Sequence, residues 1–324
     1  MKRFVACGLA FLAGLAAGRA EATPRVVSVV FNGGPDSPQQ IGAEAFRQAI
    51  RAHFGDKLAV DLRGGSTLGS ENSLILAVQN GAADFAVLTG PAVGPVVPNF
   101  GIFDVPFLFR DTAHVQHVVD GPIGTSIASN FPAKGLVLLA VGEQGFRNIT
   151  NSKRPIQTAS DVKGLKMRVV PNEIYQMTFR TLGADAVPLD LPLLYAALKD
   201  NRVDGEENPV ATVAVSHFQD VQKYMSLTGH FYSALAFIEN LETSQKFSPA
   251  DAAAIAAAAR EAAETTRTAS AAARQKYLDE LKKSGMQIVE SVDRDSFVAA
   301  LAPLEPQFEE RFGKDKLAAI RATP

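Results

Sequence analysis

The chain alternates short, strongly apolar runs with longer segments in which apolar residues recur at helical spacing. The run RVVSVVF at 25–31, for example, precedes a polar loop and then an amphipathic segment at 41–53. Apolar runs of this length are typical of buried strands, and strands separated by helical segments predict parallel β-α-β units. The first half of the chain is therefore predicted to contain strands at 25–31, 58–64, 83–90 and 135–145, and helices at 41–53, 69–81 and 111–131.

A second series of the same kind begins after residue 145. The segment at 90–109 is rich in proline and glycine but also strongly apolar, which predicts an ordered connection rather than a flexible linker. Two successive series predict an α/β fold with two domains, for which 324 residues are sufficient. The second series is predicted to contain strands at 164–170, 186–190 and 231–240, helices at 172–182 and 192–200, and a turn or strand at 203–208.

The pattern changes at 249–283, where alanine and other strong helix formers dominate. Ser248 is a good N-cap, Pro249 suits the first helical position, and Gly285 can end the helix. A helix of this length spans about 50 Å, more than one small domain. Its apolar face is mostly alanine and no Leu/Ile heptad runs through it, which argues against a coiled coil. The segment is predicted to lie as a brace across two lobes.

The N-terminus has the pattern of a secretory signal. Lys2 and Arg3 precede an apolar run from Phe4 to Ala17, and Ala-Glu-Ala at 20–22 forms a cleavage site. The sequence therefore predicts a signal peptide at 1–22, cleavage after Ala22, and an exported, soluble protein. The formal net charge of −2 gives no reason to expect a nucleic-acid partner, because such proteins carry a basic patch.

No motif in the chain predicts catalysis, a metal or a cofactor. GGSTLGS at 64–70 has the glycine spacing of a phosphate loop but has serine where that motif needs lysine. His114 and His117 are three residues apart with no third ligand nearby, and VDGEENP at 203–209 lacks the alternating ligands of a calcium loop. No arrangement of nucleophile and base is recognisable, so an enzyme is not expected.

Arg168 lies near the middle of the apolar run GLKMRVV at 164–170. On a strand, Arg168 shares its face with Lys166 and Val170, so this face is mixed. Two interpretations are open: a solvent-exposed arginine, as most arginines are, or a fixed cation that binds an anion. Asn208 precedes Pro209, which restricts it to an extended conformation and predicts that its amide is held rigidly.

Several segments, in order, resemble one family over nearly all of the mature chain. They are STLGSENSLILAVQNGAADFAV, GFRNITNSKRPI, DVKGLKMRVVPN, LGADAVPLDLPLLYAALKDNRVDGEENPVATV and the alanine-rich helix. Together they resemble the DctP-type periplasmic substrate-binding proteins of TRAP (tripartite ATP-independent periplasmic) transporters. The resemblance implies a two-lobed α/β fold braced by the long helix. Lobe I would be 23–145 with part of 231–265 returning to it, and lobe II would be 146–230 with C-terminal helices at 266–324 packed across the lobes.

The resemblance also implies which residues bind ligand. In this family the arginine of the GLK-x-RV strand, here Arg168, forms a two-pronged salt bridge with a ligand carboxylate. The arginine of G-x-R-x-x-TN, here Arg147, commonly lines the pocket, and the ENP asparagine, here Asn208, typically hydrogen-bonds the ligand.

Further positions carry over less directly. Asn32 follows the first strand, and Thr89 ends the third, where relatives contact ligand. Many relatives place an aromatic residue under the ligand where this chain has Leu191, and the glutamine usual before ENP is Glu206 here.

The implied function is capture of an organic acid, such as a sugar acid or a C4-dicarboxylate, between two lobes that close around it. The implied partners are the small and large membrane subunits of a TRAP permease, and the implied state is a periplasmic monomer without cofactor. Two alternatives stay open. One is a binding protein of an ABC importer, and the other is a periplasmic enzyme that processes carboxylates and uses Arg147 and Arg168 as clamps.

Overall fold

The computed structural model describes residues 25–65 and 68–324, and the predicted signal peptide at 1–22 lies outside these residues. The described chain forms a nine-stranded mixed sheet in the order β2-β1-β3-β8-β4-β7-β5-β6, with β9 beside β8. The strands are β1 (Arg25–Val30), β2 (Leu58–Arg63), β3 (Phe85–Thr89), β4 (Leu136–Asn151), β5 (Lys166–Val169), β6 (Asp185–Pro188), β7 (Gly205–Pro209), β8 (Tyr224–Asn240) and β9 (Gln287–Val289).

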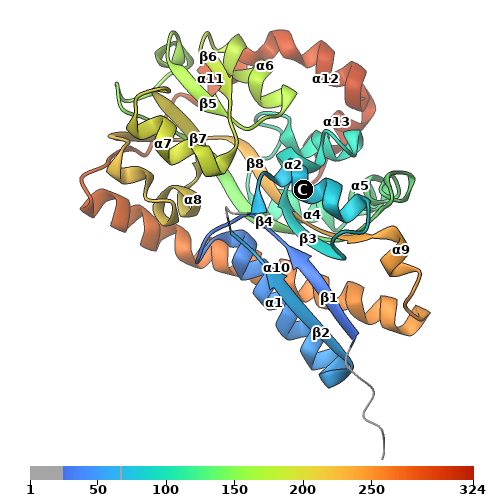
Figure 1. The fold of residues 1–324 in the computed structure, drawn as a ribbon. Coiled ribbons are helices and arrows are strands. Elements are labelled where there is room, and N and C mark those ends of the chain that lie inside the picture. The colour runs from blue at the N-terminus through green and yellow to red at the C-terminus, as the bar shows by residue number, and fades with distance from the viewer. Residues whose placement is uncertain (1–24, 66–67) are drawn as a thin grey trace, which may run out of the picture.

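Helices cover both ends of this sheet (Figure 1). None of the helices in the described ranges is long and apolar enough to cross a membrane. The helices are α1 (Pro38–Phe54), α2 (Glu71–Gln79), α3 (Gly90–Val93), α4 (Thr112–Val119), α5 (Pro122–Ala128), α6 (Glu173–Thr181), α7 (Leu194–Lys199), α8 (Val210–Val215), α9 (Leu241–Ser244), α10 (Pro249–Lys283), α11 (Arg294–Leu301), α12 (Glu305–Phe312) and α13 (Lys314–Ala322).

The predicted parallel units are present at both ends of the sheet. Strand β1 pairs in parallel with β2 and β3, and β5 pairs in parallel with β6 and β7. The two ends are joined by β4 and β8, which pair antiparallel to each other over their full lengths. The expected bounds of these two strands, 135–145 and 231–240, are too short. Strand β4 continues to Asn151 because it pairs with β7, and β8 already begins at Tyr224, where it pairs with β9. The sequence of these added stretches does not predict a strand.

The strands β4 and β8 are irregular where they pass between the two ends. Their register shifts between Glu143 and Gly145 and again between Arg147 and Ile149. Gly145 has a backbone φ of 119°, a value that residues other than glycine rarely adopt. Because bulges bend a strand and interrupt its ladder of hydrogen bonds, this region is suited to bending.

The predicted helix at 111–131 is two helices, α4 and α5. Gly121 and Pro122 separate them, and Pro122 is the first residue of α5. Proline has no N–H to donate to a preceding turn, and a side chain at 121 would lie 2.6 Å from the carbonyl oxygen of His117. The expected single helix is therefore wrong, for a reason that is local in the sequence.

The long helix α10 begins and ends at the predicted residues, and the Ser248 side chain accepts a hydrogen bond from the backbone N–H of Asp251. Figure 1 shows it, in orange, running from beside α1 to beside α8. Its first half packs Ile255 into the core around β1 and β3. Its second half packs Leu278 and Leu281 into the core of α7 and α8. The prediction of a brace is confirmed.

Gly142 of β4 allows α10 to approach the sheet closely. A Cβ atom at this position would lie 2.3 Å from Thr266 Oγ1 and 3.2 Å from Ala263 Cα, both on α10. We expect Gly142→Ala to reduce the free energy of unfolding by about 1–3 kcal/mol, as measured by urea denaturation, because overpacking shifts the helix. Gly34→Ala is the control, since no atom lies within 4 Å of its added Cβ. Equal stability of both variants would contradict this packing.

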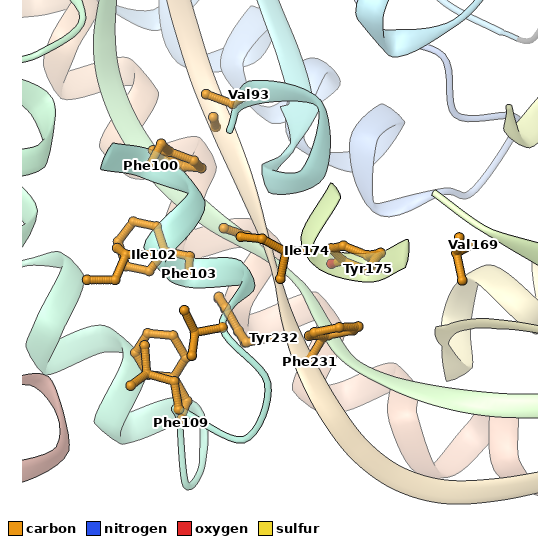
Figure 2. Close-up of a cluster of buried hydrophobic side chains, with 14 of the residues drawn as sticks. Val93, Phe100, Ile102, Phe103, Phe109, Val169, Ile174, Tyr175, Phe231 and Tyr232 are labelled. Carbon is orange, nitrogen blue, oxygen red and sulfur yellow. The ribbon is translucent and has the colours of Figure 1, made fainter. Parts of the chain in front are cut away.

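The segment at 90–109 is ordered, as predicted. It forms α3 and the 3-10 helix η3 (Pro98–Asp104), and it buries Phe100 and Phe103. Figure 2 shows Phe103 near Ile174 of α6, and Tyr175 of α6 next to Phe231 of β8; all belong to the same buried core as Phe100. The ring centroids of Tyr175 and Phe231 are 4.1 Å apart. This shared core fixes α6 against β8 in the middle of the sheet, where the predicted site residues gather.

Candidate ligand-binding site

The residues predicted as a site meet at one cleft. It lies where β1, β3, β5 and β7 end, and the carboxyl ends of strands in open α/β sheets are where ligands bind. The cleft is narrow, and part of it is open to solvent. Its lining includes all six predicted residues, which are Asn32, Thr89, Arg147, Arg168, Leu191 and Asn208.

Arg168 of β5 is buried, with 2% of its surface exposed, so the interpretation as a surface arginine is wrong. Its Nε donates a hydrogen bond to the carbonyl oxygen of Leu189 at 2.7 Å. Within the described part of the chain, no carboxylate pairs with it and its two Nη groups donate to no protein acceptor. Burial lowers the pKa of Arg168, opposed by the Glu207 and Glu206 carboxylates, but an arginine remains charged. Arg168 is therefore a buried cation whose two Nη groups are available to a ligand.

Arg147 of β4 is equally buried but already paired. Its Nε and Nη2 contact the Glu207 carboxylate at 2.5 and 3.0 Å, and Nη2 also donates to the Glu207 carbonyl at 2.6 Å. Burial disfavours both charges, yet their attraction raises the pKa of Arg147 and lowers the pKa of Glu207. The Arg147 guanidinium carbon lies 5.4 Å from the centre of the Tyr175 ring. Arg147 therefore lines the cleft with its charge largely neutralised.

Asn208 is held at both ends of its amide. Its Oδ1 accepts from Arg147 Nη2 at 3.0 Å, and its Nδ2 donates to Glu206 Oε2 at 2.5 Å. The amide orientation follows from these partners, because an arginine can only donate. Asn208 thus joins the paired arginine to a second buried carboxyl group.

The opposite wall of the cleft carries hydrogen-bond acceptors. The Thr89 hydroxyl and backbone N–H both donate to Glu71, at 2.5 and 2.8 Å. Burial raises the pKa of Glu71, against these hydrogen bonds. Asn32 is 4% exposed, and its Oδ1 has no hydrogen-bond partner among the described residues. Leu191, half-buried in the 3-10 helix η6 (Leu191–Leu193), supplies an apolar surface.

Sequence reasoning missed five polar residues that line the cleft: Gln39, Glu71, Asn72, Gln144 and Asp190. Glu71 is the first residue of α2, directly after its N-cap Ser70, so helix capping could have placed it near the strand ends. Gln144 sits in the irregular part of β4, where register shifts make side-chain direction unreadable from a period of two.

In the described ranges, no three His, Cys, Asp or Glu side chains lie close enough together to hold a metal ion. The two histidines singled out in the sequence contact the C-terminus instead. A ring nitrogen of His114 lies 2.7 Å from the carbonyl oxygen of Ile320, and one of His117 lies 2.9 Å from that of Pro324.

Residues 30–311 match the family described as bacterial extracellular solute-binding protein, family 7, or DctP. This chain belongs to the DctP family. A DctP relative from Escherichia coli, the 2,3-diketo-L-gulonate-binding periplasmic protein YiaO, is 33% identical over 277 residues, which are 86% of this chain and 84% of the relative.

Solved DctP-type structures superpose closely. A TRAP periplasmic solute-binding protein from a Polaromonas species, bound to D-erythronate, has a TM-score of 0.90 and 38% identity, covering 92% of this chain and 99% of its own. One from Bordetella, with density interpreted as pantoate, has a TM-score of 0.90 and 35% identity, covering 93% and 99%. The predicted two-lobed fold and the TRAP family are confirmed, which decides against an ABC importer.

Proposed function

We propose that this protein captures an organic carboxylate between its two lobes, with Arg168 as the clamp. The supporting observation is the buried Arg168 guanidinium, whose two Nη groups have no protein acceptor in the described residues. A planar guanidinium matches a carboxylate through two parallel hydrogen bonds. A buried charge is stable only when it is paired, so a bound carboxylate supplies the missing partner.

The ligand class that fits best is a sugar acid or another hydroxylated monocarboxylate. Arg168 offers a place for one carboxylate, whereas Arg147 is already paired with Glu207. Around it the cleft presents the Asn32 amide and the Glu71 carboxyl group, which suit the hydroxyl groups of a polyol chain. A second ligand carboxylate would be repelled by the Glu71 carboxyl group in its ionised form. The erythronate bound by the Polaromonas relative is of the favoured class.

The proposed mechanism is closure of the two lobes around the ligand. Lobe I consists of 23–145 with part of 231–265, and lobe II of 146–230, with 266–324 packed across both. They bend at the irregular region of β4 and β8, and the ligand shifts the population toward the closed form. We infer that the protein is exported after cleavage following Ala22, carries its ligand unchanged as a periplasmic monomer, and delivers it to the two membrane subunits of a TRAP permease.

Thermal unfolding of the purified protein tests the ligand class. The panel consists of D-erythronate, D-galactonate and succinate, each beside its amide. An acid present at about 1,000 times its dissociation constant should add about 4 kcal/mol to the free energy of unfolding and raise Tm by a few degrees. We expect shifts with the sugar acids and none with their amides. Shifts that are equal for acids and amides, or absent throughout, would overturn carboxylate capture.

A further inference from the structure

Glu206 lies behind the cleft and does not line it, yet it is joined to the site by hydrogen bonds. Its side chain is fully buried in β7. Its Oε2 accepts from Asn208 Nδ2 at 2.5 Å, and its Oε1 lies 2.9 Å from Thr150 Oγ1 of β4. The inference below rests on the proposed function, because it concerns how Asn208 and Arg168 receive a carboxylate.

The hydrogen bonds around Thr150 can all be satisfied if Glu206 carries a proton. The Thr150 hydroxyl faces two acceptors, Glu206 Oε1 at 2.9 Å and Gln222 Oε1 at 3.2 Å, but it carries a single hydrogen. The orientation of the Gln222 amide is fixed, because its Nε2 donates to the carbonyl oxygen of Val221 at 2.9 Å. A hydrogen on Glu206 Oε1, donated to Thr150, frees the Thr150 hydrogen for Gln222. All three groups are then satisfied.

Burial and the neighbouring Glu207 carboxylate favour the same protonated state, whereas Arg168 opposes it. Glu207 is its neighbour on β7, Arg147 lies on β4 and Arg168 on β5. Burial and the Glu207 carboxylate raise the pKa of Glu206 to about 7, against the lowering effects of Asn208 and Arg168. With Glu206 ionised, two carboxylates balance two arginines. With Glu206 protonated, one positive charge remains for the incoming ligand.

We propose that Glu206 is a positioning residue that orients the Asn208 amide and that, at a pH where it is ionised in the ligand-free protein, it takes up a proton when a carboxylate binds beside it. The ligand's negative charge disfavours an ionised Glu206, so the bound form holds the proton more tightly than the free form does. Affinity is therefore highest below about pH 7 and falls as pH rises from there to the pKa of the liganded form. At higher pH it becomes constant again.

Binding measured against pH tests this coupling, with D-erythronate as the probe. For the wild type we expect affinity to fall between pH 7 and 9, at most about tenfold per pH unit. Glu206→Gln mimics the protonated group and should keep the high affinity across this range. Glu239→Gln is the matched control, because burial raises the pKa of Glu239 to about 8 but it is not part of the cleft lining. It should retain the wild-type profile.

Two further measurements separate this proposal from the proposed function. Calorimetry in two buffers of different ionisation enthalpy should detect net proton uptake in the wild type at pH 8 and less in Glu206→Gln. Infrared spectra of the ligand-free protein, taken as the difference between wild type and Glu206→Gln, should show one protonated carboxyl band that disappears between pH 6 and 9, because the band of Glu239 is common to both proteins and cancels. Binding with the same pH profile in wild type and Glu206→Gln would overturn the coupling and leave carboxylate capture intact. Absence of the infrared band would overturn it even if D-erythronate does not bind.

Discussion

Replacing Arg168 with glutamine should abolish high-affinity binding of the organic acid. Removing one partner of a buried ion pair costs about 3–5 kcal/mol, which corresponds to an affinity loss of about a hundredfold to a few thousandfold. The loss should be at the high end of this range. In the wild type no protein group of the described residues competes for the two Nη groups of Arg168, so the ligand carboxylate gains the whole interaction, and all of it is lost in the variant. Isothermal titration calorimetry with the acid that gives the largest thermal shift measures it.

Two controls show whether the loss arises from the clamp itself. Arg168→Lys keeps the charge but not the planar fork, so its affinity should lie between those of the wild type and Arg168→Gln. Arg180→Gln, at an exposed position on α6, should bind like the wild type. The ligand-free Arg168→Gln protein should unfold at no lower temperature than the wild type, because an unpaired buried charge has been removed. Binding by Arg168→Gln within threefold of the wild type would exclude Arg168 as the clamp.

Replacing Glu207 with glutamine should reduce the free energy of unfolding by about 3–5 kcal/mol at pH 7, as measured by urea denaturation. The reason is that Arg147 would lose its bidentate partner while buried, with Arg168 unpaired nearby. The pKa of Glu207 is lowered in the folded state. Its stabilising contribution is therefore present at neutral pH and is lost as pH falls through the folded-state pKa.

The double variant Arg147→Met/Glu207→Leu tests whether the effect comes from the uncompensated charge. It should be more stable than Glu207→Gln, because no buried arginine at position 147 is left unpaired. The exposed pair of Arg311 and Glu173, with nitrogen and oxygen 3.0 Å apart, is the surface control. Glu173→Gln should change the free energy of unfolding by less than about 1 kcal/mol. A loss as small as this in Glu207→Gln would contradict a stabilising role for the pair.

The sequence by itself determined most of the secondary structure and six of the residues that line the cleft. Strands such as β1 and the long helix α10 are readable because their signals are local, namely an apolar run or a dense stretch of helix formers with an N-cap and a stop. The combination of GLK-x-RV with ENP identified the family, and its positions lie together at the strand ends. The break between α4 and α5 at Gly121-Pro122 is also a local signal, although the expected helix at 111–131 runs through it.

Only the tertiary structure decided what each site residue can do. Arg168 and Arg147 look alike in sequence, both beside apolar neighbours, but Arg147 meets Glu207, a residue 60 positions away, and Arg168 meets no carboxylate in the described residues. The full length of β4 and β8 likewise depends on strands paired with them from elsewhere in the chain. Hydrophobic periodicity reports which side of an element faces the core. It does not report which charged residue from a distant part of the chain lies beside a buried arginine. That residue determines whether the arginine is paired within the protein or needs the carboxylate of a ligand.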